Sequence, residues 1–98
     1  MIVRLVKMIF IPEKVDSFIQ LFNDRKKAIT AFPGCLELKL LIHIKNDGII
    51  FTYSEWDSDA ALEEYRKSDL FIKTWKEAKV YFREKPEAWT TTVYSQEY

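Results

Sequence analysis

The fold is decided by residues 36–56, which read LELKLLIHIKNDGIIFTYSEW. In the first half of this stretch apolar side chains occupy every second position: Leu36, Leu38, Leu40, Ile42 and Ile44. A period of two is that of a β-strand with one apolar face. Asn46, Asp47 and Gly48 tolerate a positive φ and predict a tight turn. The aromatic and β-branched run 49–56 then predicts the returning strand of a β-hairpin.

Upstream, residues 2–11 are rich in Ile, Val and Phe and predict another strand. Pro12 follows, and proline suits the first turn of a helix. Side chains at helical spacing continue from there, namely Val15, Phe18, Phe22, Arg25 and Ile29, with Ile19 and Leu21 widening the stripe. This helix should end before Phe32-Pro33-Gly34, because a residue that precedes proline is pushed out of helical geometry.

Downstream, Ser58 and Ser68 are good N-cap residues and predict two successive helices. The second helix should carry Phe71, Trp75, Ala78 and Phe82 on one face. We expect Pro86 to end it and Trp89–Tyr94 to form the last strand.

The order strand, helix, strand, strand, helices, strand predicts an α+β, ferredoxin-like βαββαβ fold. A right-handed crossover leaves room for the third strand between the first two, which gives a four-stranded antiparallel sheet with helices on one face. The first strand is apolar on both faces: Ile2, Val6, Met8 and Phe10 on one, and Val3, Leu5, Ile9 and Ile11 on the other. Leaving the second face in water would cost about 25 cal/mol per Å² of apolar area. We therefore expect a homodimer.

The composition limits the function. A chain of 98 residues suits a single domain, residues 1–98. Lys plus Arg and Asp plus Glu both total 15, and this balance argues against a nucleic-acid partner. The single cysteine, Cys35, cannot form an internal disulfide, so we expect a cytoplasmic setting. No apolar run approaches the roughly 20 residues that span a bilayer, so no membrane association is expected.

Two segments resemble a known family. The first runs from Trp56-Asp57-Ser58 through Ala60-Ala61-Leu62 and Tyr65 to Ser68-Asp69-Leu70-Phe71, and the second is Phe32-Pro-Gly-Cys-Leu-Glu-Leu. Both are similar to segments of the antibiotic-biosynthesis monooxygenases, and the similarity extends over nearly the whole chain. The resemblance implies a dimeric α+β barrel with a pocket between the sheet and the helices of each subunit.

The resemblance also implies chemistry. Several members of the family oxidise phenols or quinols with O₂ and with no metal or flavin, whereas others degrade haem. Haem-degrading relatives carry Asn, Trp and an axial His at places that match Lys7, Tyr65 and the run 74–77 here. The missing histidine argues against haem degradation.

His43 is the only histidine, and it could act as the general base that removes a phenolic proton. The alternative, which we favour, is a solvent-facing strand histidine. Tyr65 is the second catalytic candidate, because a buried hydroxyl needs a partner that a substrate could supply. The candidate substrate-binding residues are Lys7, Tyr53, Trp56, Phe71 and Trp75. The aromatic members could hold a planar ring or could simply be core, and Lys7 could bind an anion or reach the sheet edge.

No cofactor is expected. The two glycines, Gly34 and Gly48, cannot build a dinucleotide or phosphate loop, and one histidine with one cysteine cannot form a closed zinc site. The leading hypothesis is a cofactor-independent monooxygenase that oxidises a small quinol- or phenol-like molecule with O₂. The alternatives are a non-catalytic or isomerase-like binder of a small metabolite and, more remotely, an RNA-binding module with strand aromatics.

Overall fold

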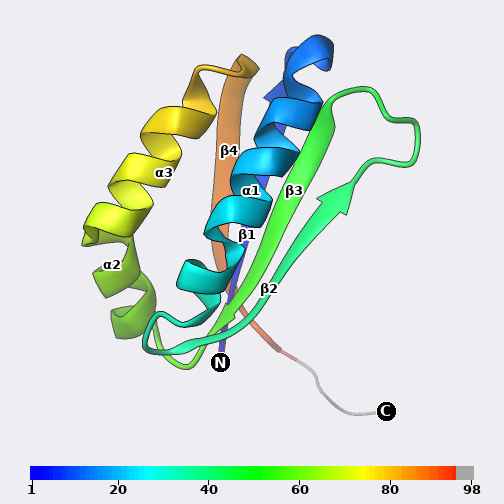
Figure 1. The fold of residues 1–98 in the computed structure, drawn as a ribbon. Coiled ribbons are helices and arrows are strands. Elements are labelled where there is room, and N and C mark those ends of the chain that lie inside the picture. The colour runs from blue at the N-terminus through cyan, green and yellow to red at the C-terminus, as the bar shows by residue number, and fades with distance from the viewer. Residues whose placement is uncertain (95–98) are drawn as a thin grey trace.

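A computed structural model describes residues 1–94 of the chain. Its elements follow the order β1 (Ile2–Phe10), a short 3-10 turn (Pro12–Lys14), α1 (Val15–Thr30), β2 (Cys35–Ile42), β3 (Ile49–Trp56), α2 (Asp59–Lys67), α3 (Asp69–Lys79) and β4 (Phe82–Thr92) (Figure 1). The single-domain expectation for residues 1–98 includes residues 95–98, which lie outside the described part. Within residues 1–94, no helix is long and apolar enough to cross a membrane.

The four strands form one antiparallel sheet in the order β2-β3-β1-β4. The third strand lies between the first two, as the crossover argument predicts. The helices all lie on one side of the sheet (Figure 1). The predicted α+β, ferredoxin-like fold is therefore confirmed.

The two faces of the sheet have different surroundings. Side chains at even positions of β1 and β3 face the helices, where Met8, Phe10 and Ile50 pack with Phe18 and Phe22 of α1 in a buried core. The odd positions face away from the helices, together with Leu41 of β2 and Trp89 of β4. These side chains include Leu5, Ile9, Phe51 and Tyr53, which are only partly buried. One apolar face of the sheet is thus left without a covering layer in the single chain.

The C-terminal part differs from the sequence prediction. The helix ends at Lys79, and the last strand begins at Phe82 rather than at Trp89. Pro86 therefore lies inside β4 and ends no helix. It is tolerated because β4 is an edge strand that pairs only with β1, and because the pairing register shifts between Lys7 and Ile9, next to this proline.

Phe82 has a different role from the predicted one. It was expected on the helix face with Trp75, but it leaves the helix and contacts both Phe10 and Trp75 from the strand, at ring-centroid distances of 5.2 and 5.5 Å. The turn before it is held by Ile11, whose N–H donates to the carbonyl of Tyr81. Packing against the core thus ends the helical pattern earlier than the local sequence predicts.

Candidate active site

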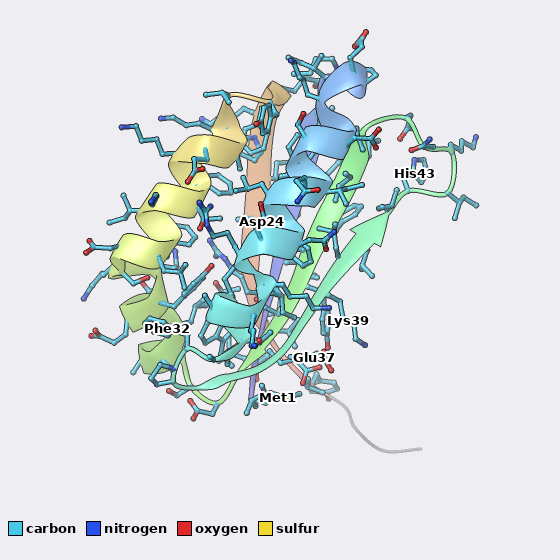
Figure 2. The ribbon with its side chains drawn as sticks, viewed as in Figure 1. Met1, Asp24, Phe32, Glu37, Lys39 and His43 are labelled. Carbon is cyan, nitrogen blue, oxygen red and sulfur yellow. The ribbon has the colours of Figure 1, made fainter. Side chains whose placement is uncertain are left out.

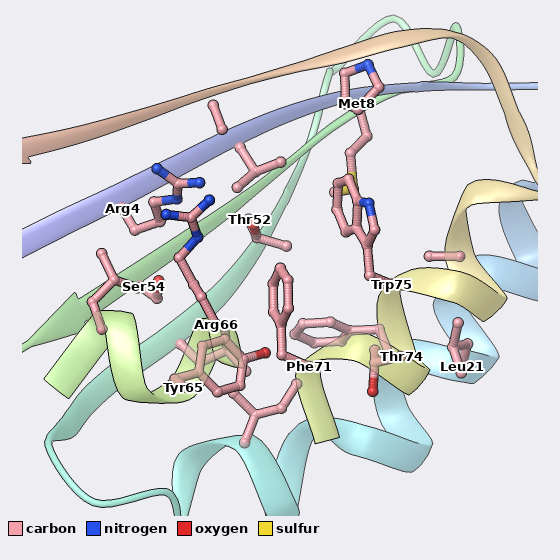
Figure 3. Close-up of a pocket in the computed structure, with 18 of the residues that line it drawn as sticks. Arg4, Met8, Leu21, Thr52, Ser54, Tyr65, Arg66, Phe71, Thr74 and Trp75 are labelled. Atoms are coloured by element: carbon pink, nitrogen blue, oxygen red, sulfur yellow. The ribbon is translucent and has the colours of Figure 1, made fainter. Parts of the chain in front are cut away.

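A cavity of about 340 Å³ lies between the helix-facing side of the sheet and the three helices. Most of its wall is apolar, and its sheet side is formed by alternate residues of β1 and β3. Figure 3 shows this space with Met8 and Thr52 on the sheet side and Tyr65, Phe71 and Trp75 on the helix side. Ala88 of β4 pairs with Val6 of β1, so β4 lies along the edge of the cavity. The cavity is therefore positioned by the strand alternation and by α1, α2 and α3.

A continuous row of four aromatic rings, one from the end of β3 and three from α2 and α3, forms part of the cavity wall. Trp56 stacks on Tyr65 at a centroid distance of 4.9 Å, Tyr65 meets the edge of Phe71 at 5.2 Å, and Phe71 stacks on Trp75 at 6.0 Å. All four line the cavity. Such a row offers both faces and edges to a planar ring.

Ser68 sets the geometry of this row. Its backbone is extended, with φ −72° and ψ 154°, and so it breaks the helix between α2 and α3. Its hydroxyl donates to the carbonyl of Tyr65 at 2.6 Å and accepts from the N–H of Phe71 at 3.1 Å. One serine therefore ends α2, caps α3 and directs the two aromatic side chains into the same space.

Tyr65 contributes the one hydroxyl among these four aromatic side chains. Burial raises the pKa of Tyr65 well above its usual value, and the nearby Cys35 raises it further. Tyr65 is consequently a neutral hydrogen-bond donor over the whole physiological pH range. No hydrogen bond from this hydroxyl is seen within the described residues. A ligand oxygen in the cavity would give it an acceptor.

Two hydroxyl groups lie on the sheet side. Ser54 is buried and accepts a hydrogen bond from the indole N–H of Trp56 at 3.0 Å. This bond orients the indole ring of Trp56, which is fully buried. Thr52, two residues earlier on β3, also lines the cavity. These groups give an otherwise apolar site a few points at which a ligand can be oriented.

Two arginines form one end of the cavity. Arg4 of β1 donates from Nη1 to Oγ1 of Thr90 at 2.7 Å. Arg66 of α2 donates from its own Nη1 to both carboxylate oxygens of Glu63, at 3.1 and 3.3 Å. Figure 3 shows the two guanidinium groups next to each other. Burial lowers the pKa of Arg4, Arg66 lowers it further, and Glu63 raises it.

The structure brings some of the predicted site residues together and separates the others. Trp56, Tyr65, Phe71 and Trp75 share the cavity. Lys7 and Tyr53 occupy odd positions of β1 and β3, on the side of the sheet that faces away from the helices. Tyr53 donates to Glu55 at 2.6 Å there, and the Lys39 ammonium lies 5.5 Å from its ring centroid.

His43 lies on the loop between β2 and β3, away from the helices (Figure 2). Its Nδ1 lies 2.9 Å from a carboxylate oxygen of Asp47, and both side chains are about two-fifths exposed, at 39% and 42%. The ring is not part of the cavity wall. This placement agrees with the alternative of a solvent-facing histidine.

Sequence reasoning missed several polar residues of the cavity: Arg4, Thr52, Ser54, Arg66 and Thr74. The alternation of β1 contained a signal for Arg4, since Arg4 falls in register with Val6 and Met8. Both faces of that strand are apolar, however, so the pattern alone does not show which face the helices cover. Residues 1–94 contain no cluster of three or more His, Cys, Asp or Glu side chains that could hold a metal ion.

The chain was compared with known proteins. Residues 1–77 match the family model described as antibiotic biosynthesis monooxygenase. No curated protein matches. Among solved structures, an antibiotic biosynthesis monooxygenase is 19% identical with a TM-score of 0.89, covering 97% of this chain and 100% of that one.

Two further solved structures have the same fold. A conserved protein from Methanosarcina mazei Go1 is 22% identical with a TM-score of 0.85, covering 92% of this chain and 90% of its own. Rv0793 from Mycobacterium tuberculosis is 14% identical with a TM-score of 0.87, covering 97% and 96%. Identities this low establish the fold alone, whereas the family model covers more than half of the sequence. The chain therefore belongs to the antibiotic biosynthesis monooxygenase family.

Proposed function

We propose that this protein is a cofactor-independent monooxygenase that oxidises a small phenol- or quinol-like aromatic molecule with O₂. The observation that carries the proposal is the cavity of about 340 Å³, whose wall is mainly apolar and includes six aromatic side chains, among them Tyr65 with its hydroxyl. Family membership supports the same chemistry.

The proposed reaction draws its electrons from the substrate. Loss of a proton gives a substrate anion, which passes an electron to O₂, and the resulting radical pair joins through a new C–O bond. Protonation of the peroxide and loss of water convert a ring CH₂ group into a carbonyl. One oxygen atom then stays in the product, the other leaves as water, and the four electrons that reduce O₂ come from the substrate.

Each part of the cavity has a role in this scheme. The aromatic wall excludes water and holds the ring, which protects the radical pair from side reactions. Tyr65, protonated because burial raises its pKa, donates a hydrogen bond to the phenolic oxygen and stabilises the anion. The proton passes to solvent at the edge of the cavity beside the exposed Ala88, because Glu87 shares a face of β4 with Trp89 and its side chain is directed away from the helices. His43 lies outside this wall and has no step in the scheme.

Oxygen uptake tests the proposal. The panel consists of anthrone, 1,4-dihydroxynaphthalene and 2-naphthol, each measured against its uncatalysed rate. Ala88→Trp should block the cavity beside β4, because Ala88 lines it and lies on an edge strand that can accept a larger side chain. The matched control is Ala60→Trp, on the exposed side of α2. Enzymatic uptake that is lost in the first variant and kept in the second supports the proposal.

The opposite outcomes are also informative. Uptake that is equal in the parent protein and in Ala88→Trp would place the chemistry outside the cavity.

The alternative function, a non-catalytic or isomerase-like binder of a small metabolite, is favoured by one observation: neither the single histidine nor the single cysteine lines the cavity. Binding of panel members with no oxygen consumption would establish this alternative.

We also propose that the protein is a homodimer joined through the uncovered face of its sheet. Leu41 and Trp89 on this face are each 45% exposed, and the half-buried Leu5, Phe51 and Tyr53 lie between them. Covering this area with a second copy would remove it from water. Trp89→Glu should therefore give a monomer in sedimentation velocity, whereas Thr90→Glu on the opposite face of the same strand should not. A parent protein that sediments as a monomer would refute this arrangement.

A further inference from the structure

We infer that Arg4 and Arg66 together bind an anionic substituent of the substrate, so that the substrate class is an aromatic acid. The inference rests on the proposed function, because it names the substrate class for the same cavity. Its basis is a pair of neighbouring guanidinium groups at one end of an otherwise apolar cavity (Figure 3).

The first step of the argument concerns charge. Two cations that lie side by side repel each other, and partial burial makes the repulsion stronger than in water. Arg4 is the more enclosed of the two, and its hydrogen-bond partner is the neutral hydroxyl of Thr90. No salt bridge to Arg4 is found among residues 1–94. An anion placed between the two guanidinium groups would remove this repulsion.

The carboxylates near this end offset only part of the positive charge, because Glu63 acts on both Arg4 and Arg66 but carries one negative charge for two cations. Glu63 is bound by Arg66 through Nη1 alone. Glu87 is aligned with Lys7 in the register of β1 and β4, on the face of the sheet turned away from the helices, and it is not among the groups that perturb Arg4. The pair of arginines thus faces one engaged carboxylate and keeps unused hydrogen-bond donors.

The second step concerns those donors. A guanidinium carries five N–H donors in a planar fork that matches a carboxylate. Arg4 uses Nη1 for Thr90 and Arg66 uses Nη1 for Glu63, so in the described part of the chain Nε and Nη2 of both side chains are available to a ligand. Two forks converging on one place can bind a carboxylate from two directions.

The third step concerns the position of the two arginines relative to the aromatic wall. Arg66 belongs to the same helix as Tyr65, and Arg4 lies on β1 two positions from Val6, so the arginine pair adjoins the aromatic wall. A ring held by Phe71 and Trp75 would carry its acidic group toward the arginines and its phenolic oxygen toward Tyr65. The site would therefore select a molecule by its ring and by its charge together.

The test is a binding measurement, which does not depend on oxidation. Isothermal titration calorimetry compares 2-naphthoate with its neutral isostere 2-naphthamide, and benzoate and anthracene-2-carboxylate vary the ring size. Charge-assisted hydrogen bonds to a guanidinium predict that 2-naphthoate binds about 10- to 100-fold more tightly than the amide. Arg4→Gln and Arg66→Gln should each lower this preference about 10-fold.

Two controls make the result specific. Lys67→Gln removes the same charge from the exposed surface of α2 and should leave the preference unchanged. Binding of the neutral amide by Arg4→Gln and Arg66→Gln shows that the cavity of each variant is intact. Arg66 is partly exposed on a helix, so its variant should fold even if the change at Arg4 disturbs the sheet.

The inference is overturned if the acid and the amide bind equally well, or if the preference survives in both arginine variants. It is also overturned if none of the three acids binds. In either case oxygen uptake by neutral phenols could still occur, so the failure of this inference is distinguishable from the failure of the proposed function.

Discussion

Replacing Tyr65 by phenylalanine should make the free protein no less stable and make it bind phenols less tightly. In the free protein Tyr65 is half-buried and lines the cavity, and no hydrogen bond to its hydroxyl is seen in the described region. A buried hydroxyl without a partner costs about 1–3 kcal/mol by mutational data. Water that enters the cavity offsets part of this cost, so we expect Tyr65→Phe to change the free energy of unfolding by between zero and about 1 kcal/mol in the stabilising direction.

In the complex with a phenol, the hydroxyl of Tyr65 is favourable, and its loss in Tyr65→Phe weakens binding. A neutral hydrogen bond from Tyr65 to a phenolic oxygen contributes about 0.5–1.5 kcal/mol, which corresponds to about 2- to 12-fold in affinity. Urea denaturation measures the first quantity, and calorimetry with 2-naphthol measures the second. Naphthalene is the control ligand, because it has no oxygen to accept the bond and should bind both proteins equally.

Two results would refute this reasoning. A loss of more than about 1 kcal/mol of stability in Tyr65→Phe would mean that the hydroxyl is already satisfied within the protein. An equal loss of affinity for 2-naphthol and naphthalene would mean that the variant has altered the shape of the cavity and has removed no specific bond.

Three other changes have defined outcomes. Gly34→Ala should destabilise the fold by about 1–3 kcal/mol in urea denaturation, because φ is +90° at this position and the added Cβ would lie 2.9 Å from Oδ1 of Asp57. Ser68→Ala should cost about 0.5–2 kcal/mol of stability through the lost cap, and it should also weaken ligand binding, since the same serine directs the aromatic wall. The hydrogen bond from His43 lowers the pKa of Asp47 below its ordinary 3.8. The stability that this lowered pKa contributes to the fold is present above pH 3.8 and is lost as the pH falls further. Thermal unfolding of Asp47→Asn should therefore depend less on pH than that of the parent protein between about pH 5 and pH 2.

The local sequence predicts most of the fold. The hairpin is formed with Asn46 and Gly48 both at positive φ, but β2 ends at Ile42 and the predicted alternation does not continue to Ile44, which is exposed in the loop. Ser58 caps α2, its Oγ accepting from the N–H of Ala61 at 3.1 Å, and Ser68 caps α3. These features depend on neighbours in the chain, so alternation and capping patterns detect them.

The end of α3 could not be predicted in this way. Phe82 continues the helical spacing of Trp75 and Ala78, and Pro86 is a common helix breaker. What ends the helix at Lys79 is a set of contacts with β1, above all the packing of Phe82 on Phe10. These residues are far apart in sequence, and no local pattern records their contact.

The site residues also differ in whether a local sequence pattern could predict them. The four aromatic residues could be predicted, because helical spacing and the end of β3 place them on one side of the sheet. Lys7 was assigned to the site and Arg4 was not, because β1 is apolar on both faces. The choice between the two faces is made by α1, α2 and α3 together, and it reverses every odd and even assignment on the strand.

The three tryptophans offer the most direct test of the claim that the cavity is the substrate site. Trp56 and Trp75 line the cavity, whereas Trp89 is 45% exposed on the opposite face of the sheet. A two-dimensional ¹H–¹⁵N NMR titration with 2-naphthol follows the three indole N–H signals separately. We predict that the signals of Trp56 and Trp75 shift in a saturable manner and that the signal of Trp89 does not. A saturable shift of Trp89 alone, with the other two signals unchanged, would contradict the account.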